Sequence, residues 1–198
     1  EEAERLLREE LDSTEAEVNE YNQKYGLNLK QHEFDALVSF SYNCGGNWMK
    51  DAGGILNETI RSGDKSNALI YSMCLWSRAG SDYILIARRK CEANLYINGV
   101  YKAYNLAGAI PDNLKHVFLD GNGGTVRYVV HGYNADDPAG IVTDFSKYPQ
   151  GVDDQGNIFT YTFAGWFTQR EGGTRITVLD GALSNGTVLY AQWADPQG

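Results

Sequence analysis

The sequence has few of the residues that mark several common classes of protein. Its three cysteines, Cys44, Cys74 and Cys91, form an odd and widely spaced set, which is no disulfide framework and lacks a C-x-x-C spacing for zinc. Buried thiols are the favoured interpretation, and one disulfide stays open if the protein is exported. No apolar run approaches the roughly 20 residues that a membrane span requires. We therefore expect no metal, no cofactor and no membrane span.

Positive charge is also scarce. The 198 residues include 17 Lys and Arg against 26 Asp and Glu, and both halves of the chain are mildly acidic. Because binding to nucleic acid depends on cations that neutralise phosphates, this balance argues against nucleic acid as a partner. The chain starts with EEAERLLREE, which contains neither an initiator Met nor a signal peptide. We therefore expect a trimmed or processed piece.

Apolar residues of the first half recur at the spacing of helices. A stripe along residues 3–25 predicts a long amphipathic helix. Residues 34–44 are apolar on several sides, so they predict the buried central helix of an all-α lobe. We expect further helices over residues 55–62, then from an N-cap at Asp64, and finally over residues 84–95.

The second half shows short strands and turns instead. Three segments rich in β-branched and aromatic residues, 125–130, 159–167 and 187–193, are separated by turns rich in Gly, Asn and Asp. We therefore predict an α+β chain of two domains. Its helical lobe, linker and small β-rich module occupy residues 1–103, 104–115 and 116–198.

Two polar or aromatic residues of the helical lobe are candidates for binding a ligand. Asn43 lies at the end of the central helix, and its amide offers a donor and an acceptor that suit a sugar. The alternative is that Asn43 is only tolerated in the last turn, before a glycine cap at Gly45 or Gly46. Trp76 could supply an apolar surface for a sugar, although a core Trp is the commoner outcome.

The segment RRKCE places Arg88 and Glu92 one helical turn apart on the same face. The simplest interpretation is an exposed ion pair worth a few tenths of a kcal/mol. In the functional interpretation, an Arg that projects from a packed helix holds a carboxylate in a cleft and tunes its pKa.

Two other constellations are predicted to be structural. The acidic run along residues 1–20 lies opposite an apolar stripe, so it is the solvated face of a helix rather than a pair of catalytic carboxylates. His32 and Cys44 resemble a base and a nucleophile, but twelve helical residues separate them by about 18 Å. A thiol enzyme is therefore not expected.

In their order and spacing, these pieces resemble the large helical lobe of the phage-type lysozymes, the muramidases to which many tailed-phage endolysins belong. The resemblance covers residues 1–98, through EEAERLLREEL, LKQHEFDALVSFSYNCGG, LWSRAG and ARRKCEANLY. It implies that Asn43 faces the glycan, that Gly45 lets the chain turn away beneath it, and that Arg88 lies near the catalytic carboxyl. We therefore predict Asn43 and Trp76 as substrate-binding residues, and Arg88 and Glu92 as residues that support the acid.

The same resemblance implies that the catalytic groups lie elsewhere. Members of the family carry their catalytic Glu, with the Asp and Thr that assist it, in a small N-terminal lobe that would precede Glu1. We therefore assign no catalytic residue to this chain and expect it to be inactive as given, because glycoside hydrolysis needs an acid and a second group across the bond.

The second half resembles a different family, the Listeria-Bacteroides repeat of bacterial surface and secreted proteins. The resemblance covers residues 115–194, through VFLDGNGGT, FAGWFT, EGGT and TVLYAQW. It implies a compact β-grasp-like module that acts as a spacer or adhesion unit and contacts a bacterial surface ligand.

The preferred hypothesis is a secreted or cell-wall associated, antimicrobial and monomeric lysozyme that cleaves peptidoglycan glycan strands and carries a wall-associating module. The alternative is a non-catalytic surface-binding or adhesion protein built on a degenerate lysozyme lobe. A third hypothesis is that another chain, or a cleaved upstream segment, completes the cleft.

Overall fold

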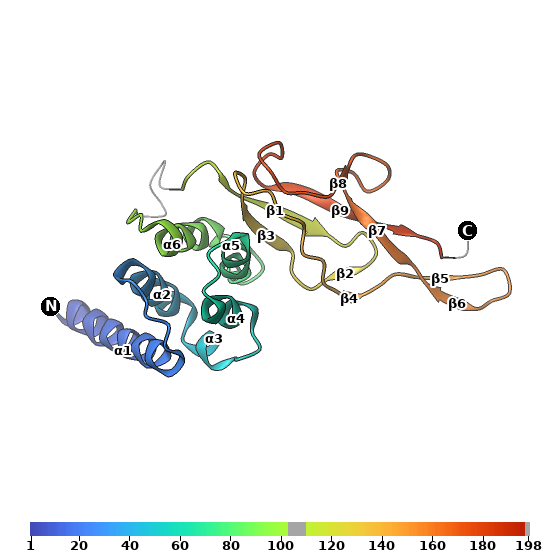
Figure 1. Ribbon diagram of the computed structural model, residues 1–198. Helices are drawn as coiled ribbons and strands as arrows, with labels where there is room; N and C mark the ends of the chain where they lie inside the picture. Colours follow the sequence, from blue (N-terminus) through green and yellow to red (C-terminus); the bar gives the residue numbers. More distant parts are fainter. Residues whose placement is uncertain (103–109, 197–198) are drawn as a thin grey trace. The chain divides into compact units, whose positions relative to one another are not determined.

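The computed structural model describes residues 1–102 and 110–196 and divides the chain into two units, residues 1–112 and 113–198 (Figure 1). The first unit is helical and the second is rich in β-strands, so the predicted α+β fold class is confirmed. Of the predicted linker, residues 104–109 lie outside the described residues. No helix of the described part is long and apolar enough to cross a membrane.

The first unit is built from six helices within its described residues. They are α1 (Glu2–Tyr25), α2 (Gln31–Cys44), α3 (Asn47–Lys50), α4 (Ile55–Ser62), α5 (Asn67–Cys74) and α6 (Ile86–Asn98). The predicted end of the first helix is confirmed, because Gly26 adopts the left-handed conformation, with φ at 61°, and its N–H closes the last turn. Gly63 and Gly99 end α4 and α6 in the same way.

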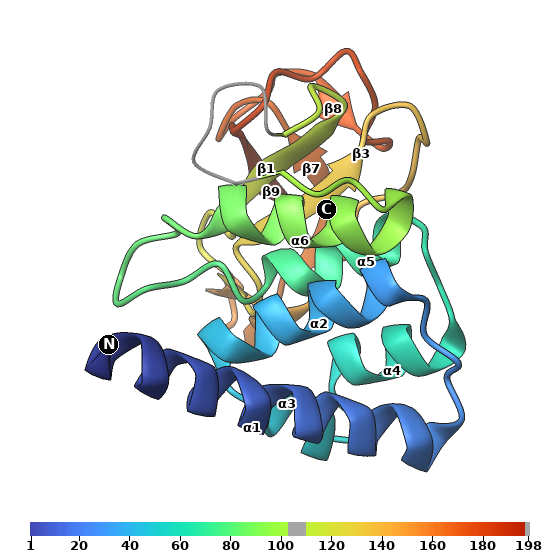
Figure 2. The ribbon, with the colours of Figure 1, turned by 90° about the vertical axis from the view of Figure 1, so that its left-hand side faces the viewer.

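Helix α2 is the centre of the helical unit, as the sequence predicted. It packs between α1 and α6 (Figure 2), and its Ala36, Leu37 and Phe40 are fully buried. Burying a Leu or Phe side chain contributes about 1.5–3 kcal/mol, so α2 supplies much of the core energy of this unit. The buried middle of α2 therefore holds the exposed residues at its two ends in a fixed position.

Two predicted helix starts are wrong. Helix α5 is capped by Ser66, whose hydroxyl accepts the N–H of Ala68, and not by Asp64. Asp64 instead accepts the N–H of Ser66, two residues before the helix begins. Helix α6 begins at Ile86, and Ile84 remains 70% exposed outside it.

The apolar stripe predicted along α1 is buried only in its second half. Val18 and Tyr21 are buried, whereas Leu6 and Leu7 are 51% and 45% exposed. The N-terminal part of α1 extends beyond the neighbouring helices (Figure 2). Periodicity predicted this helix correctly, but it did not show how much of the stripe its own unit covers.

The second unit contains a mixed sheet and two small ribbons. Its strands are β1 (Leu114–Asp120), β2 (Thr125–Val126), β3 (Val130–Asn134), β4 (Phe145–Lys147), β5 (Gln150–Val152), β6 (Ile158–Thr160), β7 (Thr162–Phe167), β8 (Arg175–Ile176) and β9 (Thr187–Ala194). The main sheet has the order β3-β1-β9-β7-β8, with β1 and β9 parallel at its centre. Two-residue to three-residue strands form the ribbons β2-β4 and β5-β6.

Two segments predicted as single strands are interrupted. Residues 125–130 divide into β2 and the start of β3, and residues 159–167 divide between β6 and β7 at Tyr161. Buried and exposed side chains nevertheless alternate across the interruption, since Phe159 and Phe163 are half-buried while Thr160 and Thr162 are exposed.

The turn after β1 explains the DGNGG motif. Asn122, at a φ of 42°, donates its side-chain amide to the carbonyls of Arg170 and Ala191. The indole N–H of Trp193 donates to the carbonyls of Gly121 and Asn122, both at 3.0 Å. The turn is therefore bonded directly to the last strand.

The stability of the second unit is expected to depend on pH, because His131 is buried. His131 in β3 is 2% exposed, and burial lowers its pKa from 6.5 to about 4. Between these values the unfolded chain binds a proton that the folded unit excludes. The stabilising effect is therefore complete above pH 6.5 and is lost as the pH falls towards 4.

At pH 5 we expect the second unit to be less stable than at pH 7.5 by about 2 kcal/mol from this group. Calorimetric unfolding of the whole chain at both values measures the loss. His131→Gln should remove most of it, and His116→Gln, at a half-buried position in β1, should retain it. An equal pH dependence in the wild type and in His131→Gln contradicts the prediction.

Candidate functional site

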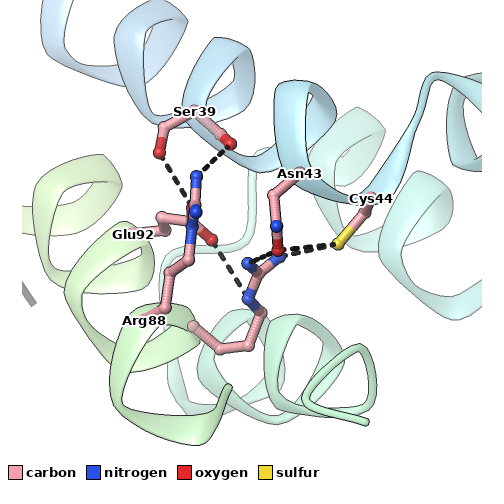
Figure 3. Close-up of polar contacts among 6 residues, drawn as sticks. Ser39, Asn43, Cys44, Arg88 and Glu92 are labelled. Carbon is pink, nitrogen blue, oxygen red and sulfur yellow. Dashed lines mark hydrogen bonds and ion pairs between the residues drawn. The ribbon is translucent and has the colours of Figure 1, made fainter. Parts of the chain in front are cut away.

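A network of polar side chains joins α2 to α6 in the helical unit (Figure 3). Glu92 of α6 is 4% exposed, and its Oε1 accepts the Nε–H of Arg88 at 2.9 Å and the hydroxyl of Ser39 at 2.8 Å. Arg88 also donates through Nη2 to the carbonyl of Ser39 at 3.2 Å. Two hydrogen bonds of Ser39 thus join the middle of α2 to α6, and the third bond joins Arg88 to Glu92 within α6.

A second arginine, Arg89, lies on the other side of the Glu92 carboxylate. Its side chain is completely buried, and its Nε lies 3.3 Å from Oε2 of Glu92. The guanidinium carbon lies 4.8 Å from the ring centroid of Phe40, which is a cation–π distance. One carboxylate therefore contacts two guanidinium groups, and this network keeps a net positive charge.

Arg89 connects the network to the end of α2. Its Nη2 donates to Oδ1 of Asn43 at 2.6 Å, and its Nη1 contacts Sγ of Cys44 at 2.7 Å. Asn43 is exposed, and Gly45 follows at φ 78° and ψ 165°, a conformation that favours glycine. The chain therefore turns away directly after the amide, as the sequence predicted.

Trp76 is connected to the same network through Phe40. Its ring meets the Phe40 ring edge to face, with centroids 5.9 Å apart. Trp76 is 37% exposed, so part of the indole faces solvent while the rest packs on the core. A continuous series of contacts therefore runs from Asn43 through Arg89 and Phe40 to Trp76. The side chains at its two ends, Asn43 and Trp76, are exposed.

Three of the four predicted site residues, Asn43, Arg88 and Glu92, belong to this network. The fourth, Trp76, reaches it through Phe40. The simplest interpretation of Arg88 and Glu92, an exposed pair, is wrong, because Glu92 is buried and the Arg88 side chain is only 20% exposed. The sequence analysis missed Arg89 and Ser39. The sequence does contain a signal for Arg89. It lies three residues after Ile86 and four before Ala93, on the buried face of α6, where apolar residues are the rule.

The structure does not bring His32 and Cys44 together. His32 Nδ1 contacts the carbonyl of Leu95 at 3.0 Å, whereas Cys44 lies beside Arg89. Burial raises the pKa of the Cys44 thiol, and the nearby Arg89 offsets this only in part. A protonated thiol is a poor nucleophile, so the arrangement does not favour thiol chemistry. Cys44, Cys74 and Cys91 are all free.

A second buried carboxylate, Glu33, has a structural role at the start of α2. Its carboxylate accepts the N–H of Lys30 at 2.8 Å and forms an ion pair with Lys65. Burial raises the pKa of Glu33, but these two contacts outweigh burial and leave the pKa lowered. Glu33 lines a cavity of about 340 Å³ with Arg61 and Tyr96. Since a lowered pKa keeps it ionised, Glu33 is a cap and not a proton donor.

The described residues contain no group of three or more His, Cys, Asp or Glu side chains placed to hold a metal ion. The donors of the network are two guanidinium groups and a hydroxyl, which favour anionic or carbonyl oxygens over cations.

Comparison with known protein families gives a match in the helical unit. The family model described as Phage lysozyme matches residues 1–92. The match includes Asn43, Trp76, Arg88 and Glu92, so the network lies within it. No curated protein and no solved structure matches the chain. The first unit is therefore a lysozyme-like lobe, followed by a β-rich unit.

Proposed function

We propose that the helical unit is the large lobe of a peptidoglycan-hydrolysing lysozyme, an N-acetylmuramidase that cleaves the β-1,4 bond between N-acetylmuramic acid and N-acetylglucosamine. The observation that carries this proposal is the network of Arg88, Arg89 and Glu92, which fixes Asn43 at the exposed end of α2. A helix–helix contact alone needs no completely buried arginine beside a buried glutamate. Asn43 and Trp76 contact the glycan, and Arg88 and Glu92 support the catalytic acid.

The acid itself lies outside these 198 residues in our proposal. The two buried glutamates of the described part are both engaged, Glu33 as a cap and Glu92 between two arginines. An acid that protonates the leaving oxygen needs a raised pKa and access to the glycan, and neither glutamate has both. A carboxyl group from another segment or chain would protonate the leaving oxygen of a glycan bound at Asn43, and water would then attack the anomeric carbon.

The β-rich unit would associate the enzyme with the bacterial surface, as a Listeria-Bacteroides repeat module. This role places the protein outside the cell, secreted or attached to the wall. Hydrolysis of peptidoglycan would also give the protein an antimicrobial activity.

A non-catalytic surface-binding protein is the second candidate. The engagement of both buried glutamates favours it, because the network can fix a ligand contact without any free acid. The two candidates differ in turnover and share the glycan as a ligand.

Release of new reducing ends from purified peptidoglycan tests the proposal. We expect no activity from the 198 residues alone and activity from an extended protein, in which the small catalytic lobe of a phage-type lysozyme is fused before Glu1. In the extended protein, Asn43→Ala should lower kcat/KM roughly tenfold, the loss of one hydrogen bond to the glycan. Lys50→Ala, at an exposed position of α3, is the control. If the extended protein binds peptidoglycan but releases no ends, the non-catalytic candidate is correct.

A further inference from the structure

The contact between Arg89 and Asn43 determines which way the Asn43 amide points. An arginine side chain has only donors, so the group that it contacts must be an acceptor. The atom 2.6 Å from Nη2 is therefore the oxygen of Asn43, and the NH₂ group lies on the other side of the amide. The Cys44 thiol, 4.0 Å from the same oxygen, is a further donor on that side.

Arg89 is itself held in place by its surroundings. Its side chain is completely buried, Nε faces Glu92, Nη1 faces Cys44 and the planar group packs on Phe40. A guanidinium with contacts at its edge and on its face does not rotate freely. The orientation that it imposes on Asn43 is consequently a fixed property of the folded lobe.

The exposed side of Asn43 then carries donors only. Within the described residues, no hydrogen bond engages its NH₂ group, and the residue is exposed. A surface asparagine without such a partner could rotate its amide and present either group. In this structure, the NH₂ hydrogens of Asn43 remain available for a ligand, whereas its oxygen is engaged by Arg89.

We propose that Arg89 is a positioning residue that makes Asn43 a selective donor, so that Asn43 recognises an amide carbonyl oxygen on the ligand. This inference rests on the proposed function, in which the ligand is a peptidoglycan strand. Such a strand carries this oxygen in the acetamido groups of its sugars and in its stem peptides. A hydroxyl both donates and accepts, so either orientation of the amide would suit it. A carbonyl only accepts, so it requires the orientation that Arg89 imposes.

The variant Asn43→Asp separates this proposal from a general role in packing. Its carboxylate keeps an oxygen for Arg89 but replaces the outward NH₂ by a second oxygen. We expect Asn43→Asp to melt at or above the wild-type temperature, and Asn43→Ala to melt lower because it leaves Arg89 short of an acceptor. Binding should change in the opposite order. Asn43→Ala should bind roughly tenfold more weakly, and Asn43→Asp more weakly still, since two acceptors would face each other.

Three probes distinguish the sources of the carbonyl. Chitopentaose carries acetamido groups without peptide, cellopentaose carries the same ring hydroxyls without acetamido groups, and a muropeptide adds a stem peptide. NMR titration of the whole chain, followed through the backbone amide of Gly45, measures weak binding to each. We expect binding of chitopentaose over cellopentaose and its loss in Asn43→Asp. Loss with the muropeptide alone would assign the carbonyl to the stem peptide.

Other outcomes overturn the inference or the proposed function separately. If Asn43→Asp binds chitopentaose and muropeptide as well as the wild type, or better, Asn43 does not act as a donor to the ligand. If Asn43→Asp melts as low as Asn43→Ala, the orientation itself is wrong. If the wild type binds none of the probes and no peptidoglycan while the melting order holds, the orientation is correct but the proposed function fails, and the assigned ligand fails with it.

Discussion

Replacing Glu92 by Gln is expected to lower the free energy of unfolding of the helical unit by about 3 kcal/mol. The substitution keeps the size of the side chain but removes a carboxylate that contacts both Arg88 and Arg89. Arg88 is partly exposed, so water screens its charge. Arg89 is completely buried, and its charge would remain without a counter-ion in a medium of low dielectric constant.

The chain offers a matched control for this experiment. Arg5 and Glu9 on α1 have the same order and the same i,i+4 spacing, but their side chains are 55% and 58% exposed. Exposed pairs of this kind contribute only about 0.3–0.5 kcal/mol, so Glu9→Gln should have little effect. Urea unfolding, followed by circular dichroism of the helices, measures both variants in the whole chain.

The comparison separates burial from sequence spacing. A loss below about 1 kcal/mol for Glu92→Gln would show that water reaches Arg89, which contradicts its complete burial. A loss that is large but equal in the two variants would show that helix propensity, and not the buried network, determines stability. The expected difference therefore tests the central geometric feature of the candidate site.

Much of the helical unit could be predicted from the sequence because its signals are local. Gly26 ends α1 and Gly63 ends α4 through left-handed conformations that depend on a few neighbouring residues. The cap of α5 was misassigned, since Asp64 and Ser66 are both good N-caps, and Ser66 is the one whose hydroxyl bonds within the helix. Such a choice between two acceptable caps is made by packing, which local rules do not include.

Only some residues of the polar network, and none of the contacts between α2 and α6, were predicted from the sequence. Spacing placed Arg88 and Glu92 on one face of a helix, and side-chain chemistry indicated Asn43 and Trp76 as sugar-binding candidates. Neither indicated that Arg89 connects Glu92 to Asn43, because that contact joins residues 46 positions apart in the chain. Burial decides whether an Arg–Glu pair contributes little or much, and burial depends on the helix that packs against it.

The β-rich unit was harder to predict in its boundaries than in its class. The aromatic run from Phe159 to Phe167 indicated one strand. The chain instead passes at Tyr161 from the ribbon β5-β6 to the main sheet, and the N–H of Tyr161 donates to the carbonyl of Pro149. A one-residue interruption of this kind depends on a distant partner. The aromatic and threonine residues alternate on both sides of the interruption, since Phe159 and Phe163 are half-buried and Thr160 and Thr162 are exposed.

The second unit should depend most strongly on Trp166. This residue of β7 is 3% exposed, its ring stacks on Phe145 at 5.6 Å and meets Phe163 at 5.4 Å. Trp166→Ala would leave a cavity that neighbouring strands cannot close, since Leu189 and Ala191 are already fully buried around the same core. We expect a loss of about 3–5 kcal/mol from this substitution.

A loss of that size approaches the whole stability of a small unit, so Trp166→Ala should leave much of the second unit unfolded at 37 °C. Ile158→Ala is the control, because Ile158 is 70% exposed on β6 and its removal should cost less than about 0.5 kcal/mol. Near-ultraviolet circular dichroism and proteolysis of the whole chain would report on the second unit. If Trp166→Ala resists proteolysis as well as Ile158→Ala does, the aromatic cluster is not the core of this unit, and its rings would then be available for the surface ligand that the proposed function requires.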